Sequence, residues 1–127
     1  MDVTPLIPAG RQIIETYGDG GFRIANVRHE GSVLVFPGRT LPWPVTDMAG
    51  LSVAALAPIS QAAKAGDVEL LLIGCGPSLA MIPRDLRAAL RAEGVVIEPM
   101  DTGAAARTFN VLMAEGRRVA AALIAVD

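Results

Sequence analysis

The sequence is poor in aromatic side chains and in the residues that build disulfides and metal sites. Its 127 residues include three Phe and only one each of Trp, Tyr, Cys and His. A single cysteine cannot form an internal disulfide, which indicates a reducing compartment. One cysteine and one histidine also give no cluster at the ligand spacing of a zinc site, so we predict no metal. Because 52% of the residues are hydrophobic, the core must be built mainly from Ala, Val, Leu and Ile.

An excess of charge of one sign and a long apolar run are also missing. The chain has 11 basic and 13 acidic side chains and a net charge of −2, which argues against a general nucleic-acid binder. No window approaches the roughly 18 apolar residues of a membrane span. The N-terminal stretch MDVTPLIPAGRQ lacks the basic start and apolar run of a signal peptide. We therefore expect a cytoplasmic protein with one domain over residues 1–127, associated with membranes only through a partner.

The first part of the sequence is typical of antiparallel strands. Residues 12–18, 22–30 and 32–37 are partly alternating or apolar, and glycines separate them. This pattern predicts a meander of three short strands joined by tight turns.

A proline-rich stretch and a helix follow. Residues 37–50 hold three prolines and two glycines, which predicts a stiff connection and excludes a central strand or a helix interior. Residues 51–64 predict a helix with Ser52 as a possible N-cap. Because Pro58 lies inside this segment, the helix must either begin late, near Ala57, or kink there.

The second part alternates between apolar runs and helical patterns. Strands are predicted at 68–74, 95–100 and 117–126, and helices at 83–94 and 101–116. The first two of these strands are expected to be buried on both faces. The combination indicates the α/β class: a three-layer domain with a central mixed β-sheet, N-terminal antiparallel strands and three main helices.

The stretch LLLIGCGPS, residues 70–78, ends a predicted buried strand at two glycines around the lone cysteine. Such a bend could offer backbone amides to an anion, although it has neither the complete dinucleotide fingerprint nor a P-loop. We favour the alternative, in which Gly74 and Gly76 only let the backbone turn and pack closely. Cys75 is either a nucleophile with a base in reach or, as we favour, a buried inert thiol.

The stretch MDTGAAARTFN, residues 100–110, carries most of the other candidate residues. Asp101 or Thr102 can cap the predicted helix, and Arg107 and Asn110 share one side of it because they are spaced i, i+3. If this segment neighbours the glycine bend, the polar side chains would line a pocket in which Arg107 pairs with an anionic group. A solvated or locally paired Arg107 is an equal alternative.

Three further features have two interpretations each. Trp43, between two prolines, either closes the core or marks a contact surface for a partner. His29 is interpreted as an exposed residue at a strand end, and contact with Cys75 lacks support. The arginines at 84, 87 and 91 are interpreted as a solvated helix face in preference to a stripe for an acidic partner.

Three stretches together resemble one family. Its pattern is a strand ending in I-G-x-G, a strand running into M-[DS]-T-x-x-A-x-R-T-[YF]-N-x-L, and a last strand E-x-R-x-V-x-A-x-L. The chain is similar in this to the small bacterial and archaeal proteins whose family includes mitochondrial NADH dehydrogenase (complex I) assembly factor 3. The matching positions are Ile73, Gly74, Gly76, Met100, Asp101, Thr102, Ala105, Arg107, Thr108, Phe109, Asn110, Leu112, Glu115, Arg117, Val119, Ala121 and Leu123. Phe109 stands where tyrosine is common.

The resemblance implies a three-layer α/β fold and no established enzymatic activity. It favours a non-enzymatic interaction or assembly factor without a cofactor. Its partners would be subunits of respiratory complex I or another assembly factor, and a homo-oligomer is compatible with it. The alternative is a small protein that binds an anionic ligand, or a cryptic enzyme. Its site would lie between the Gly74–Ser78 bend and the Asp101–Asn110 helix start.

Overall fold

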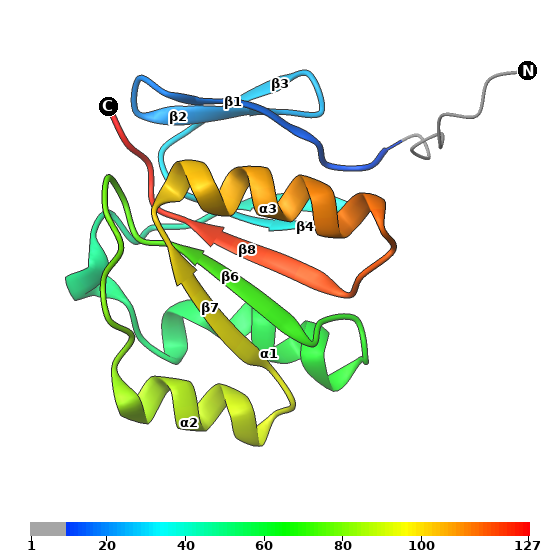
Figure 1. Cartoon of the computed structure of the whole chain (residues 1–127), viewed down its shortest axis with the longest axis vertical. Coiled ribbons are helices and arrows are strands. Elements are labelled where there is room, and N and C mark those ends of the chain that lie inside the picture. The colour runs from blue at the N-terminus through cyan, green and yellow to red at the C-terminus, as the bar shows by residue number, and fades with distance from the viewer. Residues whose placement is uncertain (1–9) are drawn as a thin grey trace, which may run out of the picture.

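The computed structural model describes residues 10–127 and contains, in this range, eight β-strands and three α-helices (Figure 1). The strands are β1 Ile14–Gly18, β2 Gly21–Ile24, β3 Val27–Glu30, β4 Val33–Phe36, β5 Arg39–Pro42, β6 Leu70–Gly74, β7 Val96–Met100 and β8 Val119–Leu123. The helices are α1 Ala57–Lys64, α2 Arg84–Ala92 and α3 Thr102–Ala114, with short 3-10 turns at Met48–Gly50 and Ala54–Leu56. The signal-peptide prediction rests mainly on residues 1–9, which lie outside the described residues.

A five-stranded mixed sheet, in the order β5-β4-β8-β6-β7, forms the centre of the molecule. Strand β6 is parallel to both β7 and β8, whereas β4 is antiparallel to β8 and β5. Figure 1 shows α3 on one face of this sheet and α1 and α2 on the other. The predicted three-layer α/β architecture with a mixed central sheet is confirmed, and a separate three-stranded sheet, β1-β2-β3, adds the predicted antiparallel strands.

Alternation along the central strands gives the sheet two apolar faces, and each face has its own core. Ala120 and Ala122 of β8 pack with the cluster that contains α1 and α2, whereas Ala121 and Leu123 pack with Phe109 of α3 and its cluster. Every residue of β8 is buried, because a strand covered by helices on both faces has no solvent side. The near-continuous apolar runs in the sequence therefore reflect helices on both sides of the sheet.

One predicted strand is in fact two. Residues 22–30 form β2 and β3, joined by a two-residue turn in which Ala25 and Asn26 have φ values of 49° and 66°. Such left-handed turns match the twist of a hairpin, and asparagine tolerates them better than most residues. The alternation of apolar and polar residues continues through this turn, which contains no glycine. The sequence pattern therefore does not indicate the turn. The third strand of the predicted meander, β4, consequently belongs to the five-stranded sheet.

The predictions for the proline-rich stretch and for the N-cap of the helix after it also need correction. Part of residues 37–50 forms β5, which pairs with β4 at the edge of the sheet, the position to which proline is normally confined. Helix α1 begins at Ala57 with Pro58 in its first turn, so the late start is correct. The Ser52 hydroxyl accepts a hydrogen bond from the Ala55 amide at 3.0 Å, and therefore does not cap α1.

Strand β7 was expected to be buried on both faces, but it is the other edge of the sheet, and Val96 and Glu98 are exposed. Two features block its free edge. Pro99 has no N–H group to donate, and Arg87 of α2 donates from Nη1 to the Ile97 carbonyl at 2.9 Å. Edges treated in this way resist pairing with another strand.

Within residues 10–127, none of the helices has the length and apolar character that a membrane crossing requires.

Trp43 closes the core beside α1. It is only 4% exposed, and its Nε1 donates a hydrogen bond to the Ala55 carbonyl at 2.8 Å. We expect Trp43→Phe to lower the free energy of unfolding by about 1–3 kcal/mol, because the bond and part of the packing are lost. Urea denaturation followed by circular dichroism measures this. Val111→Ala, at a residue of α3 that is 58% exposed, should change it by less than about 0.5 kcal/mol. A Trp43→Phe variant as stable as the parent would contradict this role.

Candidate functional site

The two segments that were expected to form a site do meet in the structure. The Gly76 amide donates to the Thr102 hydroxyl at 3.0 Å, and the Thr102 amide donates back to the Gly76 carbonyl at 2.8 Å. The Cys75 amide donates to the Met100 carbonyl at 2.8 Å. We call this contact between the end of β6 and the start of α3 the strand-end junction, comprising Gly74, Cys75, Gly76 and Thr102.

The strand-end junction uses its polar groups internally. The amides of Cys75 and Gly76 both have backbone or hydroxyl partners and are not free to cradle an anion. The Thr102 hydroxyl is fully buried and also donates to the Ile124 carbonyl at 2.7 Å. A single side chain thus connects β6, α3 and the end of β8.

Gly74 is required here for close packing. A Cβ atom at this position would lie 2.9 Å from Leu123 Cδ2 and 3.0 Å from the backbone Cα of Thr102. The first distance is shorter than real Cβ contacts and the second is tighter than most of them, so a side chain here would require the Leu123 side chain and the start of α3 to shift. The packing interpretation of the glycines therefore agrees with the geometry.

The side chains of Cys75 and Asp101 also contact backbone groups of the protein itself. Cys75 is buried, with Sγ at 3.6 Å from the Ile73 carbonyl and 3.8 Å from the Ala80 carbonyl. His29 lies on β3, in the other sheet. Asp101 is the N-cap of α3, and its Oδ1 accepts from the Ala104 amide at 2.8 Å. The cap is thus Asp101, while Thr102 is already inside the helix.

Arg107 and Asn110 interact with β1, and their side-chain hydrogen bonds within the described residues run to this strand and not to the glycine bend. Arg107 donates to the Tyr17 hydroxyl at 3.2 Å. The Asn110 side chain accepts from the Ile14 amide at 2.9 Å and donates to the Ile14 carbonyl at 2.8 Å, as a neighbouring strand would. These residues dock the three-stranded sheet onto α3. Their spacing predicted a shared side of the helix but could not show what covers that side.

Gly103 completes this docking, and the sequence did not reveal its role. A Cβ atom at this position would lie 2.7 Å from Cζ of Tyr17, so the ring can approach α3 only because the residue is glycine. The tertiary contact therefore accounts for a glycine in the first turn of α3, where alanine would be the better helix former.

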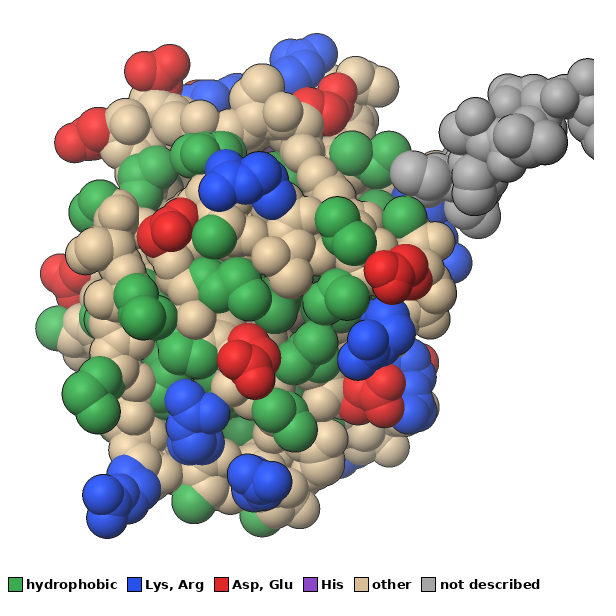
Figure 2. Space-filling model, viewed as in Figure 1, with side chains coloured by type: hydrophobic (Ala, Val, Ile, Leu, Met, Phe, Trp, Pro, Cys, Tyr) green, Lys and Arg blue, Asp and Glu red, His purple; other side chains and the backbone are tan. Residues whose placement is uncertain are grey.

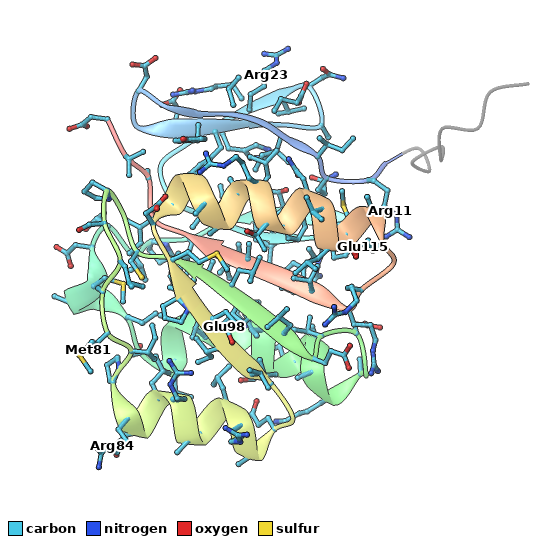
Figure 3. All side chains as sticks on the ribbon, viewed as in Figure 1. Arg11, Arg23, Met81, Arg84, Glu98 and Glu115 are labelled. Carbon is cyan, nitrogen blue, oxygen red and sulfur yellow. The ribbon has the colours of Figure 1, made fainter. Side chains whose placement is uncertain are left out.

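A surface that sequence reasoning overlooked lies just beyond the strand-end junction. Leu79 is 66% exposed and Met81 is 93% exposed in the loop between β6 and α2. With Arg84 and Arg87 they line a cavity of about 730 Å³, and we call these four residues the Met81 patch. Figure 3 shows Met81 and Arg84 projecting outward beside the start of α2. The available signal was the apolar stretch SLAMIP between a glycine bend and a helix.

Comparisons with known proteins give a matching family, relatives in sequence and similar solved structures. The family described as "Protein of unknown function (DUF498/DUF598)" matches residues 14–124. An uncharacterized protein from Rhodobacter capsulatus is 46% identical over 116 residues, which cover 91% of this chain and 86% of that protein. The crystal structure of a Bartonella henselae protein, described as an outer membrane protein, is 39% identical. It superposes with a TM-score of 0.85 over 93% of this chain and 98% of its own.

A vertebrate relative has a more specific name. NADH dehydrogenase (ubiquinone) 1 alpha subcomplex assembly factor 3 from Xenopus tropicalis is 32% identical over 111 residues, which cover 87% of this chain. The chain spans only 60% of that protein's length.

Replacing Gly74 tests the packing role of the strand-end junction. We expect Gly74→Ala to lower the free energy of unfolding by about 1–3 kcal/mol, because backbone atoms of Thr102 would have to move. Gly38→Ala is the matched control, since a Cβ atom there meets open space, and should leave stability within about 1 kcal/mol of the parent. Chemical denaturation of both variants checks this. Equal stability of the two variants would refute the packing role.

Removing the Thr102 hydroxyl tests the polar connection. Thr102→Val keeps the shape but leaves the Gly76 amide and the Ile124 carbonyl without their partner. We expect a loss of about 2–4 kcal/mol, since each unsatisfied buried group costs about 1–3 kcal/mol. Thr108→Val, at a half-buried position of the same helix, should cost less than about 1 kcal/mol. Thermal unfolding followed by circular dichroism compares the two, and a Thr102→Val as stable as Thr108→Val would contradict the assignment.

Proposed function

The chain belongs to the DUF498/DUF598 family, and from this premise we propose that it is a non-enzymatic assembly factor that docks on a subunit of a respiratory NADH dehydrogenase. The printed name of the Xenopus tropicalis relative supports this role. The observation that carries the proposal is the Met81 patch, because an assembly factor needs an exposed surface with which to hold its client.

The Met81 patch presents two large apolar side chains from the loop between β6 and α2. The loop alternates, with Leu79 and Met81 exposed while Ala80 and Ile82 face the core. Apolar side chains held outward in this way gain free energy only when a partner covers them. Methionine is unbranched and adapts its shape to a partner, and it is enriched at the centres of interfaces.

Charge around the Met81 patch indicates the chemistry of the partner. Arg84 is exposed at the start of α2, and Arg87 lies in the next turn of the same helix. Figure 2 shows basic side chains below the hydrophobic ones on this side of the molecule. The proposed occupant is therefore a protein surface with an apolar hollow rimmed by carboxylates, which arginine pairs with in a bidentate manner.

The nearby edge of β7 restricts how such a partner binds. Pro99 and the Arg87–Ile97 hydrogen bond leave the strand few groups for main-chain pairing. Docking therefore proceeds through side chains at the Met81 patch and not by addition of a strand to the sheet.

A charge placed at the centre of the patch tests this function. We expect Met81→Asp to lose binding, because a carboxylate would be buried against an apolar and acidic surface. Tagged parent and variant are incubated with detergent-solubilised membranes of the source organism. Subunits of the NADH dehydrogenase are then quantified by mass spectrometry. The parent should enrich at least one subunit about tenfold over untagged beads, and Met81→Asp should not, because a single residue at the centre of an interface can carry much of the binding energy.

The control variant is Val27→Asp, which introduces the same charge at a valine that is 55% exposed on β3, in the other sheet. It should retain the subunits, and a strain lacking the protein should recover NADH:quinone oxidoreductase activity with Val27→Asp but not with Met81→Asp. If the parent enriches no subunit of this enzyme, or if Met81→Asp behaves as Val27→Asp does, the proposal is wrong.

A further inference from the structure

A second cavity lies at the other end of the central strands from the strand-end junction. It has a volume of about 570 Å³, and arginines from three separate segments line it: Arg11, Arg39, Arg117 and Arg118. Arg11 precedes β1, Arg39 begins β5, and the other two lie between α3 and β8. Strands β6 and β8 begin near this cavity, which we call the basic cavity, and run in parallel toward Gly74. The basic cavity and the Met81 patch are therefore at opposite ends of these parallel strands.

The lining of the basic cavity has a strong charge imbalance. Four arginines and one acidic residue, Asp67, line it, and Glu69 is already paired with Arg118, which leaves a formal charge of +2 in a chain whose net charge is −2. Glu115, the residue directly after α3, does not line the cavity. Positive charge concentrated in a concave site attracts anions more strongly than the same charge spread over a surface.

Two of the four guanidinium groups are held in place. Arg118 donates to the Glu69 carboxylate at 2.6 Å and to the Gly66 carbonyl at 3.2 Å. The guanidinium carbon of Arg39 lies 4.7 Å from the centre of the Phe36 ring, a stacked position that leaves its N–H edge free for another partner. Preorganised donors of this kind bind an anion with less loss of side-chain freedom.

Arg11 and Arg117, like Arg39, lack a carboxylate partner in the described part of the chain. Among residues 10–127, ion pairs form only between Arg28 and Glu30 and between Arg118 and Glu69. Arg11 and Arg117 therefore bring uncompensated charge to the cavity. Its floor is partly apolar, with Phe36, Ala62 and Met113 in the lining.

We propose that the basic cavity binds a small organic molecule that carries at least two anionic groups, phosphate or carboxylate. Its volume is within the roughly 300–1,000 Å³ range of small-ligand sites. Guanidinium groups bind both kinds of anion through paired N–H···O hydrogen bonds. Arginines in several segments can contact separate anionic groups of one ligand, while the apolar floor contacts its carbon skeleton. A single monovalent anion would leave most of this charge unpaired.

Two probes distinguish the sources of the negative charge. Pyrophosphate represents phosphate ligands and citrate represents polycarboxylates, each titrated by isothermal calorimetry against a chloride control of equal ionic strength. We expect at least one probe to bind with a Kd of about 1 mM or tighter. Its addition should shift the amide resonances of Gly38 and Gly116 more than those at the Met81 patch. No binding of either probe at 10-fold higher concentration would overturn the proposal.

Matched double variants separate a site from general charge attraction. Arg39→Gln with Arg117→Gln removes two charges from the cavity, and Arg23→Gln with Arg91→Gln removes two exposed charges elsewhere. We expect at least about a tenfold loss of affinity in the first variant only. An equal loss in both would mean nonspecific attraction and overturn the proposal. Arg39→Lys with Arg117→Lys, which keeps the charge but loses the paired geometry, should also weaken binding, and unchanged affinity in it would refute the proposed paired contacts.

Discussion

The buried hydroxyl of Thr102 is the contact on which the arrangement of the other elements depends. It accepts from the Gly76 amide and donates to the Ile124 carbonyl, and so connects the end of β6, the first turn of α3 and the chain after β8. Both backbone groups would otherwise be buried without a partner, which costs more free energy than an average hydrogen bond contributes. Gly74 makes the connection possible, because only a residue without a side chain lets α3 come this close to the sheet.

Helix α3 then positions the rest of the molecule through both of its sides. One side packs on the five-stranded sheet through Phe109 and the buried alanines. The other carries the three-stranded sheet, held by the Asn110 bonds to Ile14 and by Tyr17 against Gly103. The polar residues that are most prominent in the sequence therefore connect layers of the structure.

The surfaces with unsatisfied chemistry lie away from this contact, at the two ends of the parallel strands. At one end, the Met81 patch exposes apolar side chains next to arginines. At the other, the basic cavity collects guanidinium groups from segments that are far apart in the sequence. The two surfaces share no lining residue. Each surface can therefore be tested without disturbing the other.

The sequence by itself determined the class of the fold, because apolar runs, helical spacing and the Pro and Gly positions are local properties. They predicted strands β6 and β8, helices α2 and α3, and the contact between the glycine bend and Asp101–Thr102. Only the tertiary structure decided what those residues do, since partners such as Ile14 and Asn110 are 96 positions apart. It also decided that β7 is an edge, that residues 22–30 turn back at Asn26, and that arginines from three distant segments share one cavity. Burial and charge proximity depend on which segments are neighbours in space, and no local pattern contains that information.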